Sequence, residues 1–182
     1  MKSSAAAPVH LKPWSETDFA LLVANNSPEM TSHLGGPETE EQLASRHRRY
    51  LAMQSDRGRM FRIALAAEEA EEAEEAEEAV GSIGYWEITW QGRPAWETGW
   101  GVLPEFQGRG IAATAARLVI AEARSTDRHR HLHAFPSQDH PASNGVCRKA
   151  GFTLRGECDF EYPKGRWMRG NDWSIDLDAG TP

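Results

Sequence analysis

The most informative run of this chain reads Val102-Leu103-Pro104-Glu105-Phe106-Gln107-Gly108-Arg109-Gly110-Ile111-Ala112. An apolar, tryptophan-rich segment (96–103) precedes it, and an alanine-rich segment with helical spacing (112–124) follows it. This order predicts a strand, a glycine-rich turn and a helix. The first N–H groups of a helix lack intrahelical partners and carry partial positive charge, so such a turn favours an anion. Its two glycines would let a phosphate approach the main chain, and the arginine between them adds a positive charge.

Three known kinds of phosphate-binding loop have glycine-rich turns like this one. No Lys-Ser/Thr pair follows the glycines, which excludes a Walker A loop. The dinucleotide fingerprint needs three small residues at fixed spacing in a βαβ unit, and it is matched only in part, with Ala113 in the third place. The pattern that fits better is Gln-x-x-Gly-x-Ala, at Gln107, Gly110 and Ala112. It resembles the acetyl-CoA pyrophosphate loop of the GCN5-related N-acetyltransferase (GNAT) superfamily.

Length and composition suit one α/β domain. The 182 residues with 40% hydrophobic content predict a single domain over 1–182 with a sizeable core. Most of the formal net charge of −7 comes from residues 68–79, which hold eight glutamates and four alanines, and the rest of the chain sums to +1. We interpret this run as an acidic insertion, either a solvated hairpin or an interaction arm. A nearly neutral body gives no basic face for nucleic acid.

Cysteine usage and hydropathy indicate the compartment. Cys147 and Cys158 form no Cys-x-x-Cys pair, so neither a disulfide framework nor a zinc site is expected, and the reducing cytoplasm is the default location. No signal peptide is recognisable and no apolar run reaches about 18 residues, so we expect no membrane span.

Hydrophobic periodicity and turn residues predict alternating strands and helices. Strands are expected at 9–14, 60–66, 80–88, 95–103, 131–136, 153–162 and 166–177, with a turn at 91–94. Helices are expected from Ser15 as N-cap, at 30–34, at 38–54, from the glycine turn to about 125, and at 140–150.

A second motif strengthens the resemblance. The stretch Asp139-His140-Pro141-Ala142-Ser143-Asn144-Gly145-Val146-Cys147-Arg148-Lys149-Ala150-Gly151-Phe152 is similar to the Asn-x-x-Ser helix of that superfamily, which ends in Lys-x-Gly-Phe. The opening Leu-x-x-Trp, Gly81-Ser82-Ile83-Gly84 and Asn171-Asp172-Trp173 resemble the branch that includes ribosomal-protein N-terminal acetyltransferases. The resemblance implies a mixed, mostly antiparallel, splayed sheet flanked by helices. It also makes a homodimer possible, since dimers are common in that branch.

The same resemblance implies a binding site for acetyl-CoA as cosubstrate. In that family the pantetheine arm pairs like an extra strand with the fourth strand, where the fourth and fifth strands splay apart. This puts Val102 and Leu103 beside it, with the Leu103 N–H a candidate to polarise the thioester carbonyl. Asn144 is a candidate hydrogen-bond partner of the pantetheine. The pyrophosphate would be held by the turn amides of Gln107, Gly108, Arg109, Gly110, Ile111, Ala112 and Ala113.

Acetyl transfer to an amine needs a neutral amine, and amines titrate at about 8 to 10.4, so a general base helps. Glu97 is our candidate, because it shares its strand face with Gly99, Gly101 and Leu103. The alternative is a solvent-facing strand residue, and the sequence leaves both open. Glu87 is the reserve base.

The departing thiolate needs a proton donor. Some family members use a tyrosine where this chain has Cys147, and the related branch uses the serine that corresponds to Ser143. The alternative for Ser143 is a hydroxyl that merely caps the helix. The family's asparagine falls at His140, which is either a base or a residue that starts the helix.

The remaining histidines and Cys147 have simpler explanations than a metal site or a nucleophile. His129, His131 and His133 alternate along a strand, but no matching carboxylate or cysteine set accompanies them, so no metal site is expected. Cys147 is better explained as a small buried helix residue than as a nucleophile.

Together these observations predict an acetyl-CoA-dependent N-acetyltransferase that acts by direct transfer in a ternary complex. The acceptor would be a protein N-terminus or a small-molecule amine. Two rivals remain at this stage, a non-catalytic CoA-binding sensor or interaction module and a nucleotide-binding βαβ domain.

Overall fold

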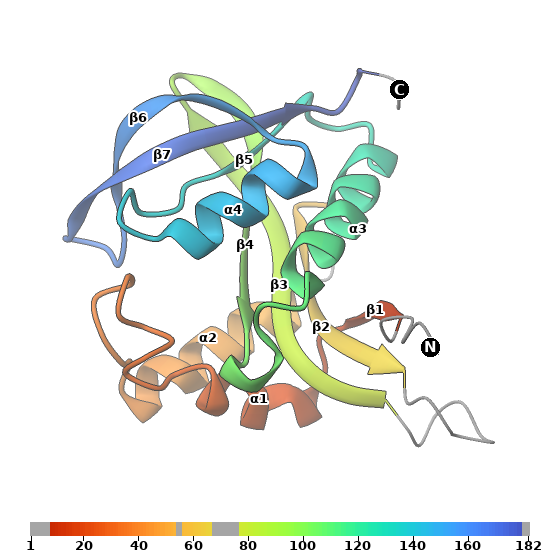
Figure 1. The fold of residues 1–182 in the computed structure, drawn as a ribbon, viewed down its shortest axis with the longest axis vertical. Coiled ribbons are helices and arrows are strands. Elements are labelled where there is room, and N and C mark those ends of the chain that lie inside the picture. The colour runs from red at the N-terminus through yellow and green to blue at the C-terminus, as the bar shows by residue number, and fades with distance from the viewer. Residues whose placement is uncertain (1–7, 54–55, 67–76, 180–182) are drawn as a thin grey trace, which may run out of the picture.

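The computed structural model describes residues 8–53, 56–66 and 77–179 (Figure 1). Within them, seven strands form one sheet in the order β1-β2-β3-β4-β5-β7-β6. The strands are β1 (Val9–Pro13), β2 (Gly58–Ala66), β3 (Glu77–Trp90), β4 (Arg93–Val102), β5 (His131–Ala134), β6 (Thr153–Glu161) and β7 (Trp167–Asp176). The helices are α1 (Phe19–Ala24), α2 (Glu40–Ala52), α3 (Ile111–Ser125) and α4 (Pro141–Ala150), with 3-10 turns at Glu16–Asp18 and Pro104–Phe106. The predicted mixed, mostly antiparallel sheet flanked by helices is confirmed.

The pairing of β4 with β5 is parallel and very short. It joins Trp96 with Leu132 and Glu97 with His133, whereas β4 pairs with β3 in antiparallel register along its whole length. Among the described residues, no strand pairs with 98–102 on the β5 side. The sheet therefore splays open beyond Glu97, as the resemblance implied.

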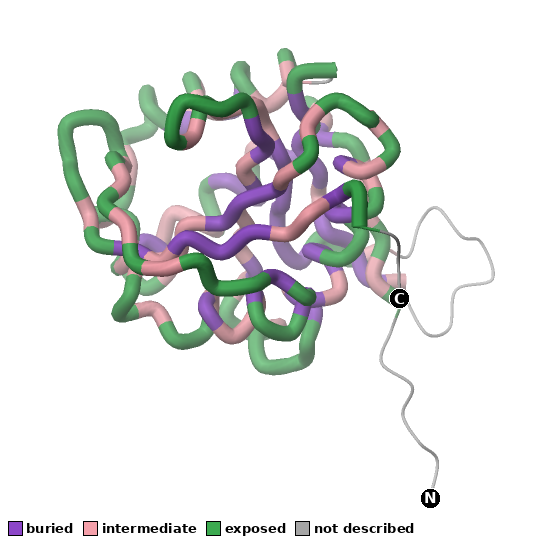
Figure 2. Tube along the Cα trace, turned by 90° about the horizontal axis from the view of Figure 1, so that it is seen from above, coloured by how far each residue is buried: buried purple, intermediate pink, exposed green. Residues whose placement is uncertain are grey.

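Helices cover both faces of the sheet. The helices α3 and α4 pack on one face, where Trp96, Val119 and Leu132 are fully buried in the larger core cluster. The helices α1 and α2 pack on the other face, around Trp14 and Met60. Figure 2 shows the buried positions running along the central strands.

Most predicted elements are confirmed, with two differences. The turn between β3 and β4 is only Gln91 and Gly92, both with positive φ (49° and 77°), as two-residue hairpin turns require. The strands therefore extend further than predicted on both sides of it. The helix predicted over 30–34 is wrong, because residues 28–35 form turns. Gly35 and Gly36, both at φ 95°, leave too short a segment for a helix.

Two helical segments begin with reciprocal caps, one at Thr39 and one at the predicted N-cap Ser15. Thr39 caps α2, since the Gln42 N–H donates to its hydroxyl (3.2 Å) and the Gln42 side chain accepts from the Thr39 N–H (2.8 Å). Asp18 accepts from the Ser15 N–H (2.8 Å), so the predicted N-cap Ser15 is part of a reciprocal cap.

Most of the glutamate and alanine run lies outside the described residues. Its last three residues, 77–79, belong to β3 and pair with the end of β2. In the described part of the chain every helix is too short or too polar to span a bilayer.

The central strands should contribute most of the stability. Ile63 on β2 is fully buried. We expect Ile63→Ala to lower the free energy of unfolding by about 2–5 kcal/mol, because it removes buried methyl groups and leaves a cavity. Urea unfolding followed by circular dichroism measures this change. Leu154→Ala is the matched control, since Leu154 is 49% exposed on β6. A similar loss in both variants would contradict this assignment of the core.

Candidate active site

The glycine turn lies between β4 and α3, as predicted. Gly108 and Gly110 both have positive φ (75° and 76°), a conformation that side-chain-bearing residues rarely adopt. Gly110 is the N-cap of α3 and has no side chain to satisfy the helix, whose first intrahelical bond runs from Thr114 N to Gly110 O. The N–H groups of residues 111–113 therefore lie in the first turn without intrahelical partners. Residues 107–110 are exposed, so an anion can reach this end of the helix.

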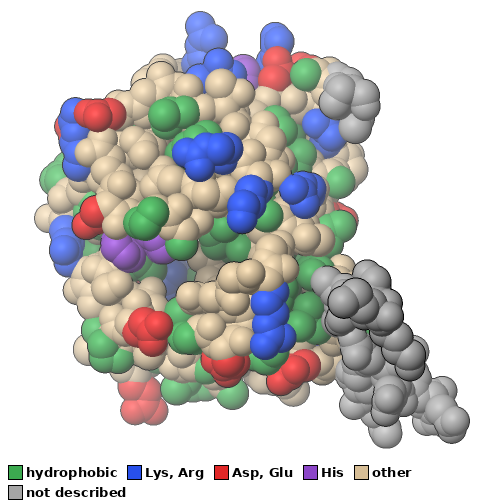
Figure 3. Space-filling view, viewed as in Figure 1, with side chains coloured by type: hydrophobic (Ala, Val, Ile, Leu, Met, Phe, Trp, Pro, Cys, Tyr) green, Lys and Arg blue, Asp and Glu red, His purple; other side chains and the backbone are tan. Residues whose placement is uncertain are grey.

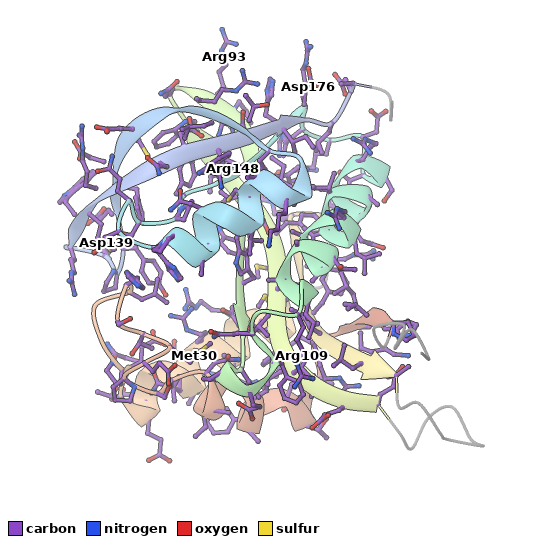
Figure 4. All side chains as sticks on the ribbon, viewed as in Figure 1. Met30, Arg93, Arg109, Asp139, Arg148 and Asp176 are labelled. Atoms are coloured by element: carbon purple, nitrogen blue, oxygen red, sulfur yellow. The ribbon has the colours of Figure 1, made fainter. Side chains whose placement is uncertain are left out.

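Two side chains shape this turn from within. Gln107 Nε2 donates to the Val102 carbonyl (2.8 Å) and thereby holds the turn against the end of β4. Arg109 donates to the Glu105 carbonyl (3.0 Å) and lies over the Phe106 ring. The Gln107 side chain thus stabilises the turn, while Arg109 remains exposed at its surface (Figure 4).

The backbone groups at the free edge of β4 differ from the prediction, because Leu103 is not one of the residues whose groups face the gap. The Leu103 N–H donates to the Val80 carbonyl of β3 (2.9 Å), so it is not available to a thioester. Antiparallel partners alternate between bonded and non-bonded pairs, and the register with β3 has no shift. The Thr98 C=O, both groups of Trp100 and the Val102 N–H therefore face the gap, while the Val102 C=O already accepts from Gln107. The sequence reveals this set only after the register with β3 is known.

Glu97 lies where the gap begins. It is the last β4 residue paired with β5, and it lies on the sheet face opposite to the fully buried Trp96. Trp86 Nε1 donates to Glu97 Oε2 (3.0 Å). Burial raises the pKa of the Glu97 carboxyl above its ordinary value, while the Trp86 hydrogen bond and the charge of His133 partly offset this. A carboxyl with these surroundings is not an ordinary solvent-facing strand residue.

The glycines beside Glu97 make room for other side chains. A Cβ at Gly99 would lie 3.1 Å from the Trp86 indole. A Cβ at Gly101 would lie 3.3 Å from Asn25 Oδ1 and 3.6 Å from Met30 Cε. This face of β4 is thus lined by one indole and by the segment that follows α1.

Glu87, the reserve base, is in a different environment. It lies on the other face of the sheet, paired in register with Trp96, and accepts hydrogen bonds from Arg128 and His129. These bonds lower the pKa of its carboxyl. Glu87 is therefore an ion-pair partner, away from Glu97 and the gap.

Ser143 and Asn144, in the first turn of α4, have different surroundings. His140 caps this helix, because its Nδ1 accepts from the Ser143 N–H (3.4 Å), so the Ser143 hydroxyl is not the cap. Asn144 is buried, and its amide makes four hydrogen bonds within the protein, two donated to the Ser137 and His140 carbonyls and two accepted from Asn171 and Trp173. We therefore assign Asn144 to anchoring α4 on β7 and no longer to the pantetheine.

Cys147 is fully buried in the core between α4 and the sheet. Burial raises the pKa of its thiol to about 12, which keeps the thiol protonated and unreactive at neutral pH. The interpretation of Cys147 as a packing residue agrees with this environment.

The surface is hollowed between α4 and the loop that leads into α3 (Figure 3). On one side, the segment after α1 reaches α4, where the rings of His33 and His140 stack with centroids 4.1 Å apart. Arg46 on α2 connects Glu38 (2.7 Å) with the Tyr162 hydroxyl (2.6 Å) near the β6–β7 turn. The two halves of the molecule are thus linked across the splayed region.

Comparisons with known proteins agree with this arrangement. The sequence model described as the acetyltransferase (GNAT) domain matches residues 9–153. A comparison with curated protein sequences gives no match.

Several solved structures share the fold. An acetyltransferase from Salmonella typhimurium that modifies the N-terminal serine of ribosomal protein L7/L12 has 19% identity and a TM-score of 0.72, over 96% of this chain and 97% of that one. The spermidine N-acetyltransferase of Vibrio cholerae, in complex with CoA and spermine, has 18% identity and a TM-score of 0.70, over 93% and 95%. A GNAT-family acetyltransferase from Bacillus anthracis has 18% identity and a TM-score of 0.70, over 96% and 98%.

At these identities the structural likeness concerns the fold, whereas the sequence match covers most of the chain together with the glycine turn and the α4 motif. This protein therefore belongs to the family of GNAT acetyltransferase domains.

Proposed function

We propose that this protein transfers the acetyl group of acetyl-CoA directly to a primary amine while both substrates are bound. One observation carries the proposal. Glu97, whose carboxyl has a pKa raised by burial, lies where β4 separates from β5, and the free edge of β4 leads from it to the exposed glycine turn. A base, a strand edge and an anion site thus follow one another along a single strand.

Acetyl-CoA fits this path by the chemistry of its parts. Its pyrophosphate would accept hydrogen bonds from the amides of residues 111–113 at the start of α3. Arg109, Arg117 and Lys149 are exposed on the turn, α3 and α4, and their charge suits the phosphates. The amide groups of the pantetheine would pair with the Thr98 C=O, the N–H and C=O of Trp100 and the Val102 N–H. The thioester then lies toward Glu97.

The reaction follows from this placement. Glu97 takes a proton from the acceptor ammonium, and the neutral nitrogen attacks the thioester carbonyl carbon. The C–S bond breaks as the C–N bond forms, and the thiolate leaves with the electron pair. Ser143, whose hydroxyl does not cap α4, is our proposed proton donor to that thiolate. The attacking nitrogen still carries two protons, and the one that it loses on forming the amide restores the Ser143 hydroxyl.

The related structures bind or modify amines that differ widely, a polyamine in one and a protein N-terminus in another. We therefore propose the acceptor class only as a primary amine. A non-catalytic CoA-binding module would not need a partly buried carboxyl at the end of the gap. The two cysteines are free thiols, which suits the cytoplasm as the location that we propose.

Glu97→Gln tests the proposed base. We expect kcat to fall by about 10²- to 10⁴-fold, because the amide cannot accept the proton, while the affinity for acetyl-CoA stays unchanged. Thiol release with a panel of amines measures kcat, and calorimetry measures the affinity. Glu41→Gln, at an exposed position on α2, is the matched control. Full activity of Glu97→Gln would disprove this role, and a wild-type protein that binds acetyl-CoA without any turnover would indicate a binding module.

The environment of Glu97 predicts a pH dependence. The carboxylate is the active form, so kcat/KM should fall as pH drops through a pKa above the ordinary 4.5. Trp86→Phe removes the N–H that stabilises the charged carboxylate, so the acidic limb of the profile should move to higher pH. The measurement is kcat/KM against pH for both proteins. An acidic limb that moves to lower pH, or stays in place, would contradict the assignment of that limb to Glu97.

Gly110→Ala tests the anion site. An alanine at φ 76° costs about 1–2 kcal/mol, so the turn should relax and the Kd for acetyl-CoA should rise by up to about ten-fold. Gly92→Ala is the matched control, because Gly92 has nearly the same φ (77°) and equally open surroundings in the β3–β4 turn. Calorimetry with acetyl-CoA compares the two. Equal affinities for acetyl-CoA in both variants would remove the glycine turn from the site.

A further inference from the structure

A second titratable side chain lies beside Glu97. His133 on β5 is the register partner of Glu97 across the short parallel pairing, and both side chains are on the same face of the sheet. Neighbouring strands are about 4.8 Å apart, so the two groups are close. His133 is 9% exposed. The sequence showed this histidine only as one of three alternating histidines, without a partner.

Asp172 holds this histidine from the other side. His133 Nδ1 lies 2.7 Å from Asp172 Oδ1, and the second oxygen of Asp172 accepts from Trp90 Nε1 (3.0 Å). Asp172 is itself buried, at 7% exposure. A carboxylate at Nδ1 keeps the proton on that nitrogen and leaves Nε2 as the atom that can accept another.

The strand order places His133 between two carboxylates. Asp172 is on β7 and Glu97 on β4, the two strands that flank β5 (Figure 1). His133 therefore adjoins a carboxylate-bearing residue on each of its two neighbouring strands. His129 lacks this arrangement, since it is bonded to Glu87 on the other face.

His133 and Asp172 also reach an open pocket of about 670 Å³. Glu97 is not among the residues that line this pocket. The other titratable or charged groups that face it are Arg93, His131, Arg155, Glu157 and Cys158. His133 is therefore the side chain through which Glu97 adjoins this pocket.

We propose that His133, oriented by Asp172, relays the proton that Glu97 removes from the acceptor amine to water in this pocket. The inference rests on the proposed function of Glu97. The proton moves from the ammonium to the Glu97 carboxylate, from the Glu97 carboxyl to His133 Nε2, and from the imidazolium to a water molecule. Glu97 and His133 then return to their starting forms, and no electrons are transferred. Asp172 remains ionised and acts as a positioning residue.

The relay solves a problem that the geometry creates. The proton that Glu97 takes up must leave before the next turnover. The bound acceptor and acetyl-CoA would cover the side of Glu97 from which the amine arrives. The chain of side chains through β5 offers a separate exit, so a proton can leave while the substrates are in place.

His133→Gln and His133→Ala test the relay. Glutamine can still donate to Asp172 but cannot carry a proton, so kcat should fall by about 10- to 100-fold, with little change in the Kd for acetyl-CoA or the KM for the amine. In His133→Ala, added imidazole should restore part of the rate by acting as a mobile proton carrier. Thiol release with an amine that the wild type acetylates measures both effects. His10→Gln, at an exposed position on β1, is the matched control.

The outcomes separate the relay from the base. Wild-type kcat in His133→Gln, beside a strong loss in Glu97→Gln, would overturn the relay and keep the proposed function. A loss in both histidine variants that imidazole does not rescue, accompanied by weaker binding of acetyl-CoA, would mean that His133 only holds β5 to β7. A wild-type protein that acetylates no amine would overturn both proposals.

Discussion

The early end of the β4–β5 pairing is the constraint on which this structure depends. Two residue pairs join the halves of the sheet, at Trp96 with Leu132 and at Glu97 with His133. A continued ladder would satisfy the Thr98 C=O, both backbone groups of Trp100 and the Val102 N–H. Their exposure to the gap costs free energy unless another partner replaces the missing strand, because unpaired buried backbone groups are unfavourable. A ligand with amide groups of its own can be that partner.

The linked halves compensate for this weak junction. Trp96 and Leu132 are fully buried on the α3 side, and Asn144 joins α4 to β7 by accepting two hydrogen bonds, from Asn171 and Trp173. On the other face, Arg46 connects α2 with Tyr162. The gap is thus an opening between two regions that are held elsewhere, and it can remain open without a continuous sheet behind it.

Local patterns in the sequence were sufficient for most elements and for the glycine turn, although they wrongly placed a helix over 30–34. The positive φ of Gly108 and Gly110 and the start of α3 depend on nearby residues, so the sequence could predict them. Contacts between residues on different strands, far apart in the chain, could not be predicted from local patterns. The Leu103 amide was assigned to the thioester because its pairing with Val80 is not local. The contacts of His133 join three strands far apart in the chain, and no local pattern reports them.

The register of the β3–β4 hairpin decides which β4 side chains face the candidate active site and which pack in the core. The two-residue turn at Gln91 and Gly92 fixes that register, and a slip by one residue would exchange the faces of the strand. Trp96 would then leave the core and Glu97 would enter it, where an unpaired carboxylate is costly. The same slip would turn the groups that now face the gap toward β3. The hydrophobic core and the candidate site therefore require the same register, because a shift by one residue would disrupt both.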